Sequence, residues 1–179
     1  MGDYEKRIIY ISSDNSNFIS DSKFNIVFDL AETMKDVAYI KVMRSEIMIN
    51  VTGIDTTLIN DINIRDSDPV FITLNDYNRI STRVGDNTIK FFDLININLS
   101  EKFGNNVPSG SVISFKNSPG TPTFNPYNSD THILLSDNNF SKFNIALYDK
   151  HNEMINRDDI VSFNMTICLY SLRKKVSQL

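Results

Sequence analysis

The sequence has a single cysteine, two histidines, no tryptophan and only six glycines among 179 residues. A disulfide needs two cysteines, so Cys168 excludes an internal bridge, which fits a chain made in a reducing compartment. A cupin-type metal site needs two or three imidazoles and a carboxylate that converge inside the barrel. The only two histidines, His132 and His151, are expected at different ends of different strands. The glycines are scattered singly and form neither a P-loop nor G-x-G-x-x-G. We therefore predict no catalytic, cofactor-binding or metal-binding residues.

Basic runs and long apolar runs are also scarce. The net charge is −4 and the only basic run is Arg173 to Lys175, so nucleic acid is not expected as a partner. No stretch approaches the roughly 20 apolar residues of a membrane helix, and the N-terminal segment lacks the apolar run of a signal peptide. The length and the hydrophobic content of 41% are typical of one globular domain.

Apolar and polar residues alternate with a two-residue period along most of the chain, and no segment has the period of an amphipathic helix. This pattern predicts an antiparallel all-β sandwich or barrel of about eight to ten strands. The predicted strands cover residues 24–29, 37–50, 56–65, 69–75, 88–99, 111–116, 132–136, 140–149 and 159–172.

Two long strands have a predicted core face. In the strand at 37–50 it consists of Val37, Tyr39, Met43, Ile47 and Ile49. In the strand at 159–172 it consists of Val161, Phe163, Met165, Ile167 and Leu169. Cys168 lies within that second apolar pattern, so we predict a buried, unreactive thiol.

The remaining segments are predicted connections. Residues 30–36 are expected to form a loop with room for one helical turn, and residues 83–87 a glycine-containing hairpin turn. Residues 101–110 and the proline-rich stretch 117–130 are expected to be irregular loops. The domain organisation that follows is an N-terminal arm at 1–20, a single β-domain at 21–172 and a C-terminal tail at 173–179.

A dense polar group lies between the last two predicted strands, from Asp149 to Glu153. Two carboxylates, an amine and an imidazole within five residues could form a site or a turn. We predict the turn, with Asn152 in the left-handed conformation and an exposed His151. The paired carboxylates of Arg157 to Asp159 are likewise predicted to form a solvated turn.

Two parts of the chain resemble the single jelly-roll capsid proteins, penton and minor capsid, of nucleocytoplasmic large DNA viruses, virophages and polinton-like viruses. Arg7 to Asn50 resembles the opening of those proteins, with Met48 where they often have proline. Ser141 to Tyr170 is similar to their closing strands, where a phrase like I-x-L-Y-D-x-x-G recurs. Asn152 stands where that phrase usually has glycine, and the matching residues are Ile145, Leu147, Tyr148 and Asp149.

This resemblance implies an antiparallel eight-stranded β-sandwich with jelly-roll topology and a structural, non-enzymatic role in the virion capsid. The leading hypothesis is a penton protein that forms a homopentamer at fivefold vertices and contacts the major capsid protein capsomers. A minor capsid protein that cements capsomers beneath the shell is an alternative, which the short predicted arm and tail disfavour. The others are a cupin-type enzyme, which the scarcity of histidine disfavours, and a receptor- or glycan-binding sandwich that uses Phe124, Tyr127 and Asp130.

Overall fold

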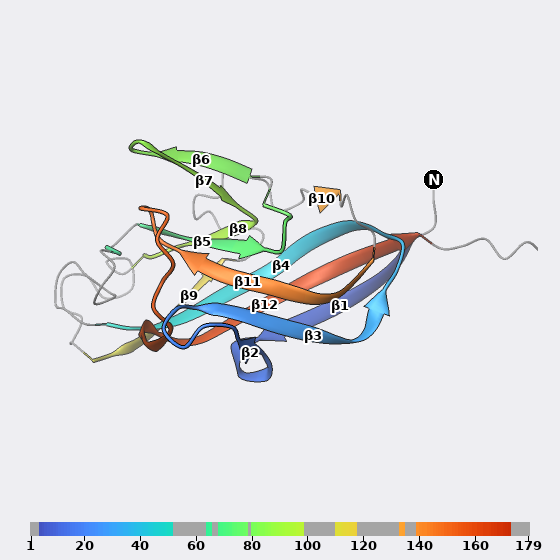
Figure 1. Ribbon diagram of the computed structural model, residues 1–179, viewed down its shortest axis with the longest axis horizontal. Helices are drawn as coiled ribbons and strands as arrows, with labels where there is room; N and C mark the ends of the chain where they lie inside the picture. Colours follow the sequence, from blue (N-terminus) through green and yellow to red (C-terminus); the bar gives the residue numbers. More distant parts are fainter. Residues whose placement is uncertain are drawn as a thin grey trace, which may run out of the picture.

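The computed structural model describes residues 4–51, 64–65, 68–78, 80–98, 110–117, 133–134 and 139–172. Within these ranges the chain consists of antiparallel β-strands and two short 3-10 turns, η1 (Ser13–Asn15) and η2 (Arg157–Asp159) (Figure 1). The prediction of an all-β antiparallel protein is confirmed. The strands are β1 (Tyr4–Ser12), β2 (Asn17–Phe18), β3 (Asn25–Met34), β4 (Val37–Asn50), β5 (Pro69–Leu74), β6 (Ile80–Val84), β7 (Asn87–Phe91), β8 (Asp93–Asn96), β9 (Val112–Asn117), β10 (Ile133–Leu134), β11 (Phe140–Tyr148) and β12 (Ile160–Leu172).

Two five-stranded sheets form the body of the protein. The β12 sheet has the order β1-β12-β4, and both β9 and β10 pair with the far edge of β4. The β11 sheet has the order β2-β3-β11-β5-β8. In Figure 1, β3 and β11 lie over β12 and β4, and buried side chains from both sheets form one hydrophobic cluster. The two sheets therefore pack face to face around a shared core.

The predicted core face of β12 is confirmed for all members except Val161, which is 45% exposed. The pairing of β12 with β4 passes from Ile160 directly to Ser162. This irregularity leaves Val161 out of the ladder, and such a bulge turns a side chain away from the face that its position in the alternation predicts. The confirmed members are Phe163, Met165, Ile167 and Leu169.

The predicted core face of β4 is wrong in its middle. Met43 is 39% exposed, whereas Ile40, which the odd-numbered pattern excluded, is fully buried. The ladder pairs Val42 with Ile167 and Arg44 with Thr166, so Met43 has no partner across from it. One extra residue moves the buried side chains from even to odd positions, because side chains alternate strictly along a strand. The residues of the predicted face that are fully buried are Val37, Ile47 and Ile49.

The loop predicted at residues 30–36 is also wrong, because β3 continues to Met34. Leu30 and Met34 extend the inward-facing apolar positions of the strand, and both pack on the core. The chain turns only at Asp36, whose φ is 54°. Pairing of Met34 with Phe140 on β11 holds the extended strand in place.

Nearly half of the predicted N-terminal arm is a strand of the β12 sheet. From Tyr4 to Ser12 every residue of β1 pairs with β12 in unbroken register. Ile11 is fully buried, and Ile9 packs on the same core. Within the segment predicted as an arm, residues 4–12 are therefore part of the β12 sheet, because these inward side chains give them a place in the core.

The hairpin turn predicted at residues 83–87 is confirmed, with Gly85 at a φ of 59° between β6 and β7. The single strand predicted after it is instead two strands, since the chain bends at Phe92 between β7 and β8. The β6–β7 hairpin packs on the outer side of the β11 sheet through a second hydrophobic cluster. Its buried members are Phe71, Ile89, Phe91 and Leu94.

The strands predicted at 69–75, 111–116 and 140–149 correspond to β5, β9 and β11. Most of the strand predicted at 56–65 lies outside the described residues. So do most of the strand at 132–136, most of both predicted loops at 101–110 and 117–130, and the tail at 173–179.

Candidate functional site

The polar segment from Asp149 to Glu153 is a turn built around a buried carboxylate. Asp149 is 1% exposed, and its Oδ1 accepts hydrogen bonds from the backbone N–H groups of His151 (2.9 Å) and Glu153 (2.8 Å). The Asp149 N–H donates to the Glu153 carbonyl at 2.9 Å, which closes the turn. Asn152 has a φ of 63°, so the predicted left-handed conformation is confirmed.

This geometry gives the segment a structural role. The side chains of His151 and Glu153 are exposed, as predicted for the histidine, while the Asp149 carboxylate is buried beneath them. The Lys150 side chain points to the residue just before β5, where its Nζ lies 2.8 Å from Asp68 Oδ2. The four polar side chains therefore do not converge on one point where a substrate could react.

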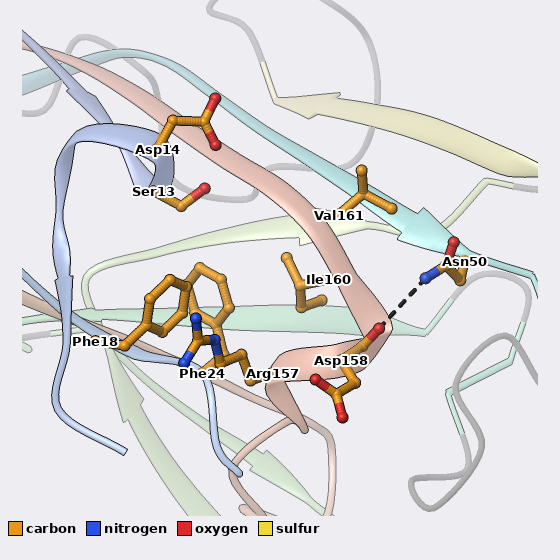
Figure 2. A pocket seen from close by; sticks show the side chains of 9 residues that line it. All are labelled: Ser13, Asp14, Phe18, Phe24, Asn50, Arg157, Asp158, Ile160 and Val161. Atoms are coloured by element: carbon orange, nitrogen blue, oxygen red, sulfur yellow. Dashed lines mark hydrogen bonds between the residues drawn. The ribbon is translucent and has the colours of Figure 1, made fainter. Parts of the chain in front are cut away.

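A surface pocket of about 330 Å³ lies where η1, β2 and η2 meet (Figure 2). The Arg157 guanidinium lies 3.8 Å from the centroid of the Phe18 ring, and its cation–π contact fixes one wall. Asn50 Nδ2 donates to the Asp158 carbonyl at 3.3 Å. The lining combines a cation, exposed carboxylates and an amide, which suits a polar ligand. The other lining residues are Ser13, Asp14, Phe24, Ile160 and Val161.

The solvated turn predicted at Arg157 to Asp159 is confirmed for Asp158, which is exposed, and wrong for Asp159, which is buried. The three residues form η2 immediately before β12, and the last of them faces the protein because the following strand enters the core there.

Among the described residues, no three His, Cys, Asp or Glu side chains are grouped closely enough to hold a metal ion. Within the same part of the chain, no helix is long and apolar enough to cross a membrane. His132 and the candidate glycan-binding residues Phe124, Tyr127 and Asp130 lie outside the described residues.

One buried polar pair connects the two sheets through the core. Ser45 on β4 is fully buried, and its hydroxyl donates to Asp93 Oδ2 on β8 at 2.6 Å. A hydrogen bond between a hydroxyl and a carboxyl group is strong in the protein interior, because little water is present there to compete for it. The pair fixes the position of β8 against β4, because a shift of either strand would break this buried hydrogen bond.

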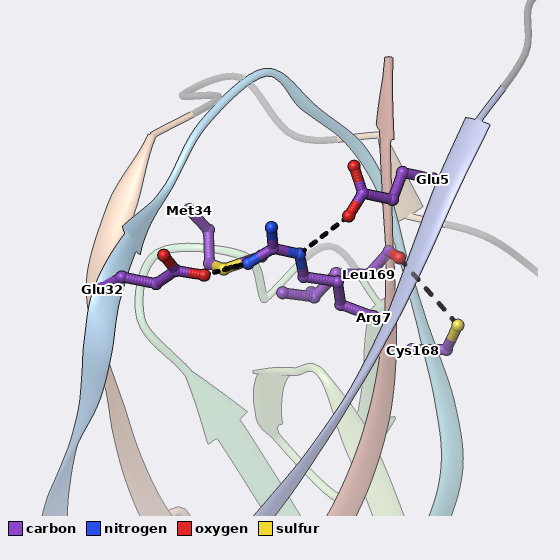
Figure 3. A network of polar contacts seen from close by, with 6 residues as sticks. All are labelled: Glu5, Arg7, Glu32, Met34, Cys168 and Leu169. Atoms are coloured by element: carbon purple, nitrogen blue, oxygen red, sulfur yellow. Dashed lines mark hydrogen bonds and ion pairs between the residues drawn. The ribbon is translucent and has the colours of Figure 1, made fainter. Parts of the chain in front are cut away.

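Arg7, on the edge strand β1 of the β12 sheet, connects that sheet to β3 of the β11 sheet (Figure 3). Its side chain leaves β1 and reaches Glu32 on β3, while Nε lies 3.2 Å from Glu5 Oε1. Nη1 also lies 3.7 Å from Met34 Sδ. Hydrogen bonds to Glu32 and Glu5 raise the pKa of Arg7, so its charge is maintained at any physiological pH.

The outward side chains of the β12 sheet, hereafter the β12 outer face, form the main exposed apolar surface. Among the described residues, seven of the eight exposed large apolar or aromatic side chains belong to strands of this sheet, and none belongs to β3, β11, β5 or β8. Ile8 and Tyr10, at 67% and 57% exposure, protrude furthest from the sheet itself. The seven are Tyr4, Ile8, Tyr10, Met43, Val112, Val161 and Leu172.

Aromatic and cationic side chains interleave on the same face. Lys6 Nζ lies 5.5 Å from the centroid of the Tyr170 ring, and Tyr4 meets Tyr39 edge-on at 5.7 Å between centroids. Burial, and then a hydrogen bond to Cys168, raises the pKa of the Tyr170 phenol. Cys168 is itself buried, as predicted, so this face offers phenol and ammonium groups and no accessible thiol.

A charged cluster lies further along the face, around Glu46. Ser114 Oγ donates to Glu46 Oε1, Lys116 Nζ lies 3.4 Å from that oxygen, and Arg44 Nη2 lies 2.8 Å from Oε2. Partial burial acts to raise the pKa of Glu46, but the Ser114 hydrogen bond and the charges of Lys116 and Arg44 outweigh it, so the pKa is lowered. Beside this cluster, the Tyr10 hydroxyl donates to Asn164 Oδ1 at 2.8 Å.

The β12 outer face was not predicted from the sequence, because its residues come from strands that are far apart in the chain. The two-residue alternation of Tyr4, Lys6, Ile8 and Tyr10 is a strand signal, but it lies in the segment predicted to be an arm.

No protein-family model matches the chain, and no curated protein sequence does. The fold and the β12 outer face are therefore the basis on which a function can be proposed.

Proposed function

We propose that this protein is a viral capsid building block with a jelly-roll fold. Its most concrete role is that of a penton protein, a homopentamer at the fivefold vertices of an icosahedral virion. Its partners there are its own copies and the surrounding major capsid protein capsomers.

The order of strand pairing carries this proposal. In a jelly roll of eight strands, one sheet contains the first, eighth, third and sixth strands, and the other contains the second, seventh, fourth and fifth. Here β1-β12-β4-β9 and β3-β11-β5-β8 pair in these orders when the eight strands are numbered along the chain. In this interpretation β2, β10 and the β6–β7 hairpin are additions to the eight.

The resemblance of the chain ends to capsid proteins falls on five of those strands, β1, β3 and β4 near the start and β11 and β12 near the end. Asp149 and Asn152 give that resemblance a physical basis. The aspartate of the L-Y-D phrase closes the turn through two backbone hydrogen bonds, and the position where the family usually has glycine takes a positive φ.

A jelly roll suits a vertex because two packed sheets form a rigid wedge with loops at both ends. Contacts that repeat head to tail close into a ring when the rotation per subunit divides the circle. Native mass spectrometry of the full chain tests this. The expected species is a pentamer of the 20.5 kDa chain.

Cryo-electron microscopy of virions that carry the protein should place its density at the vertices. A strictly monomeric protein, with density away from the vertices, would contradict the penton role. Density beneath the shell and between capsomers would instead identify a cement protein.

The pocket at Arg157 and Phe18 favours a second candidate, a glycan-binding sandwich, because carbohydrate sites combine aromatic walls with carboxylate, amide and guanidinium groups. A glycan array probed with the full chain decides this point. The absence of any hit would remove the candidate.

A further inference from the structure

The two sheets present very different outer faces. The β11 sheet is partly covered by the β6–β7 hairpin, and its other outward residues include Asn25, Asp29 and Lys142, with no large exposed apolar side chain among those described. The β12 outer face instead exposes Ile8 and Tyr10 next to each other on the edge strand β1. Concentrated exposure of this kind on one face is typical of a binding surface.

The β12 outer face also carries a charge opposite to that of the chain. Its outward charged side chains give a net charge of +3, whereas the whole chain has −4, so the rest of the chain is net negative. Lys6 pairs with Tyr170, and Lys41 pairs with Cys168, which in turn pairs with Ile8. Both lysines therefore lie close to the exposed apolar side chains of β1. The charged residues are Lys6, Lys41, Arg44, Lys116 and Glu46.

This charge distribution discriminates between the two kinds of contact that identical chains can make. A twofold contact would place the positive face of one copy against the same face of another, and like charges in an interface are unfavourable. A heterologous contact places the positive face against a different, net negative surface of the next copy. Heterologous contacts are also the kind that build rings of more than two subunits.

We propose that the β12 outer face is the heterologous self-assembly surface of this protein, and that it docks on an acidic surface of the next copy. The inference rests on the proposed homopentamer and adds which face each subunit contributes. A shallow hollow of about 100 Å³ beside Tyr10, lined also by Arg44, Glu46, Asn164 and Thr166, gives that face a recess for a side chain of the neighbour.

Two independent double variants of the full chain test the proposal. Ile8→Ser with Tyr10→Ser removes the protruding apolar groups, and Lys6→Glu with Lys41→Glu reverses the charge. All four side chains lie on the outward side of the sheet, so the variants should fold, which circular dichroism would verify. The matched controls are Ile19→Ser, an exposed isoleucine outside this sheet, and Lys142→Glu on β11.

The measurement is the protein concentration at which half of the chains are assembled, obtained by native mass spectrometry over a dilution series. Each double variant should raise it at least tenfold, and both controls should leave it within twofold of the wild-type value. Raising the salt from about 0.05 M to about 0.5 M should weaken wild-type assembly, because the complementary charges are screened.

The outcomes separate the two proposals. A wild-type chain that never assembles would contradict the homopentamer itself. Wild-type rings that both double variants also form at unchanged concentrations would overturn the assignment of this face and leave the homopentamer standing. A wild-type dimer as the largest species would contradict the homopentamer and overturn the heterologous contact as well.

Discussion

Replacing Asp149 by alanine should cost about 3 kcal/mol of the free energy of unfolding. Its carboxylate accepts two backbone hydrogen bonds, at 2.9 and 2.8 Å, and is 1% exposed. Each hydrogen bond to a charged acceptor contributes about 1.5–3 kcal/mol. Because the neighbouring His151 is exposed, water can reach part of the opened turn, so the lower end of the summed range is expected.

For a chain of this length, such a loss corresponds to a fall in Tm of about 6–12 °C. Urea unfolding followed by circular dichroism measures the free energy directly. His151→Ala is the matched control, since only the backbone N–H of that residue takes part, and it should leave stability and assembly unchanged. Asn152→Gly should be neutral or slightly stabilising, because glycine adopts a positive φ without strain. An Asp149→Ala chain within about 0.5 kcal/mol of wild type would refute this account of the turn.

Three further perturbations address the core and the β12 outer face. Ser45→Ala removes one hydrogen-bond donor to buried Asp93 and should cost about 2 kcal/mol in the same urea assay. Glu46 has a lowered pKa, so its stabilisation is present above the ordinary carboxyl value of 4.5 and is lost as the pH falls through and below it. Glu46→Gln should therefore flatten the loss of thermal stability between about pH 5 and pH 3, measured by melting at each pH. Cys168 is buried, so a thiol reagent should label it slowly in the native protein and fast in urea, with an equal native rate contradicting the burial.

The sequence predicted the strands well wherever the two-residue alternation ran unbroken. β5, β11 and the inner face of β12 from Phe163 onward follow from their apolar residues, because side chains that alternate along a strand place every second one on the core. The polar turn at Asp149 was also predictable, since short polar residues and an asparagine able to take a positive φ lay between two strands.

Tertiary pairing decided the segments that failed. The sequence of residues 30–36 contains good helix formers such as Ala31 and Glu32, yet Glu32 is in β3, where it binds Arg7 from β1. The N-terminal segment gains its strand from β12, more than 150 residues away in the chain. Neither partner is visible in a local pattern, because strand propensity depends on neighbours across the sheet.

Two residues that the core prediction placed wrongly are also exposed apolar residues of the candidate interface, and both facts have the same cause. The alternation predicts Met43 and Val161 in the core, but both lie at ladder irregularities that turn their side chains to solvent. Both therefore belong to the exposed apolar set of the β12 sheet. A bulge leaves the rest of a strand buried while it redirects one side chain, so it can place an apolar contact outward without a loss of core. On the proposed assembly surface, Met43 and Val161 therefore add apolar side chains from β4 and β12 to those that Ile8 and Tyr10 present on β1.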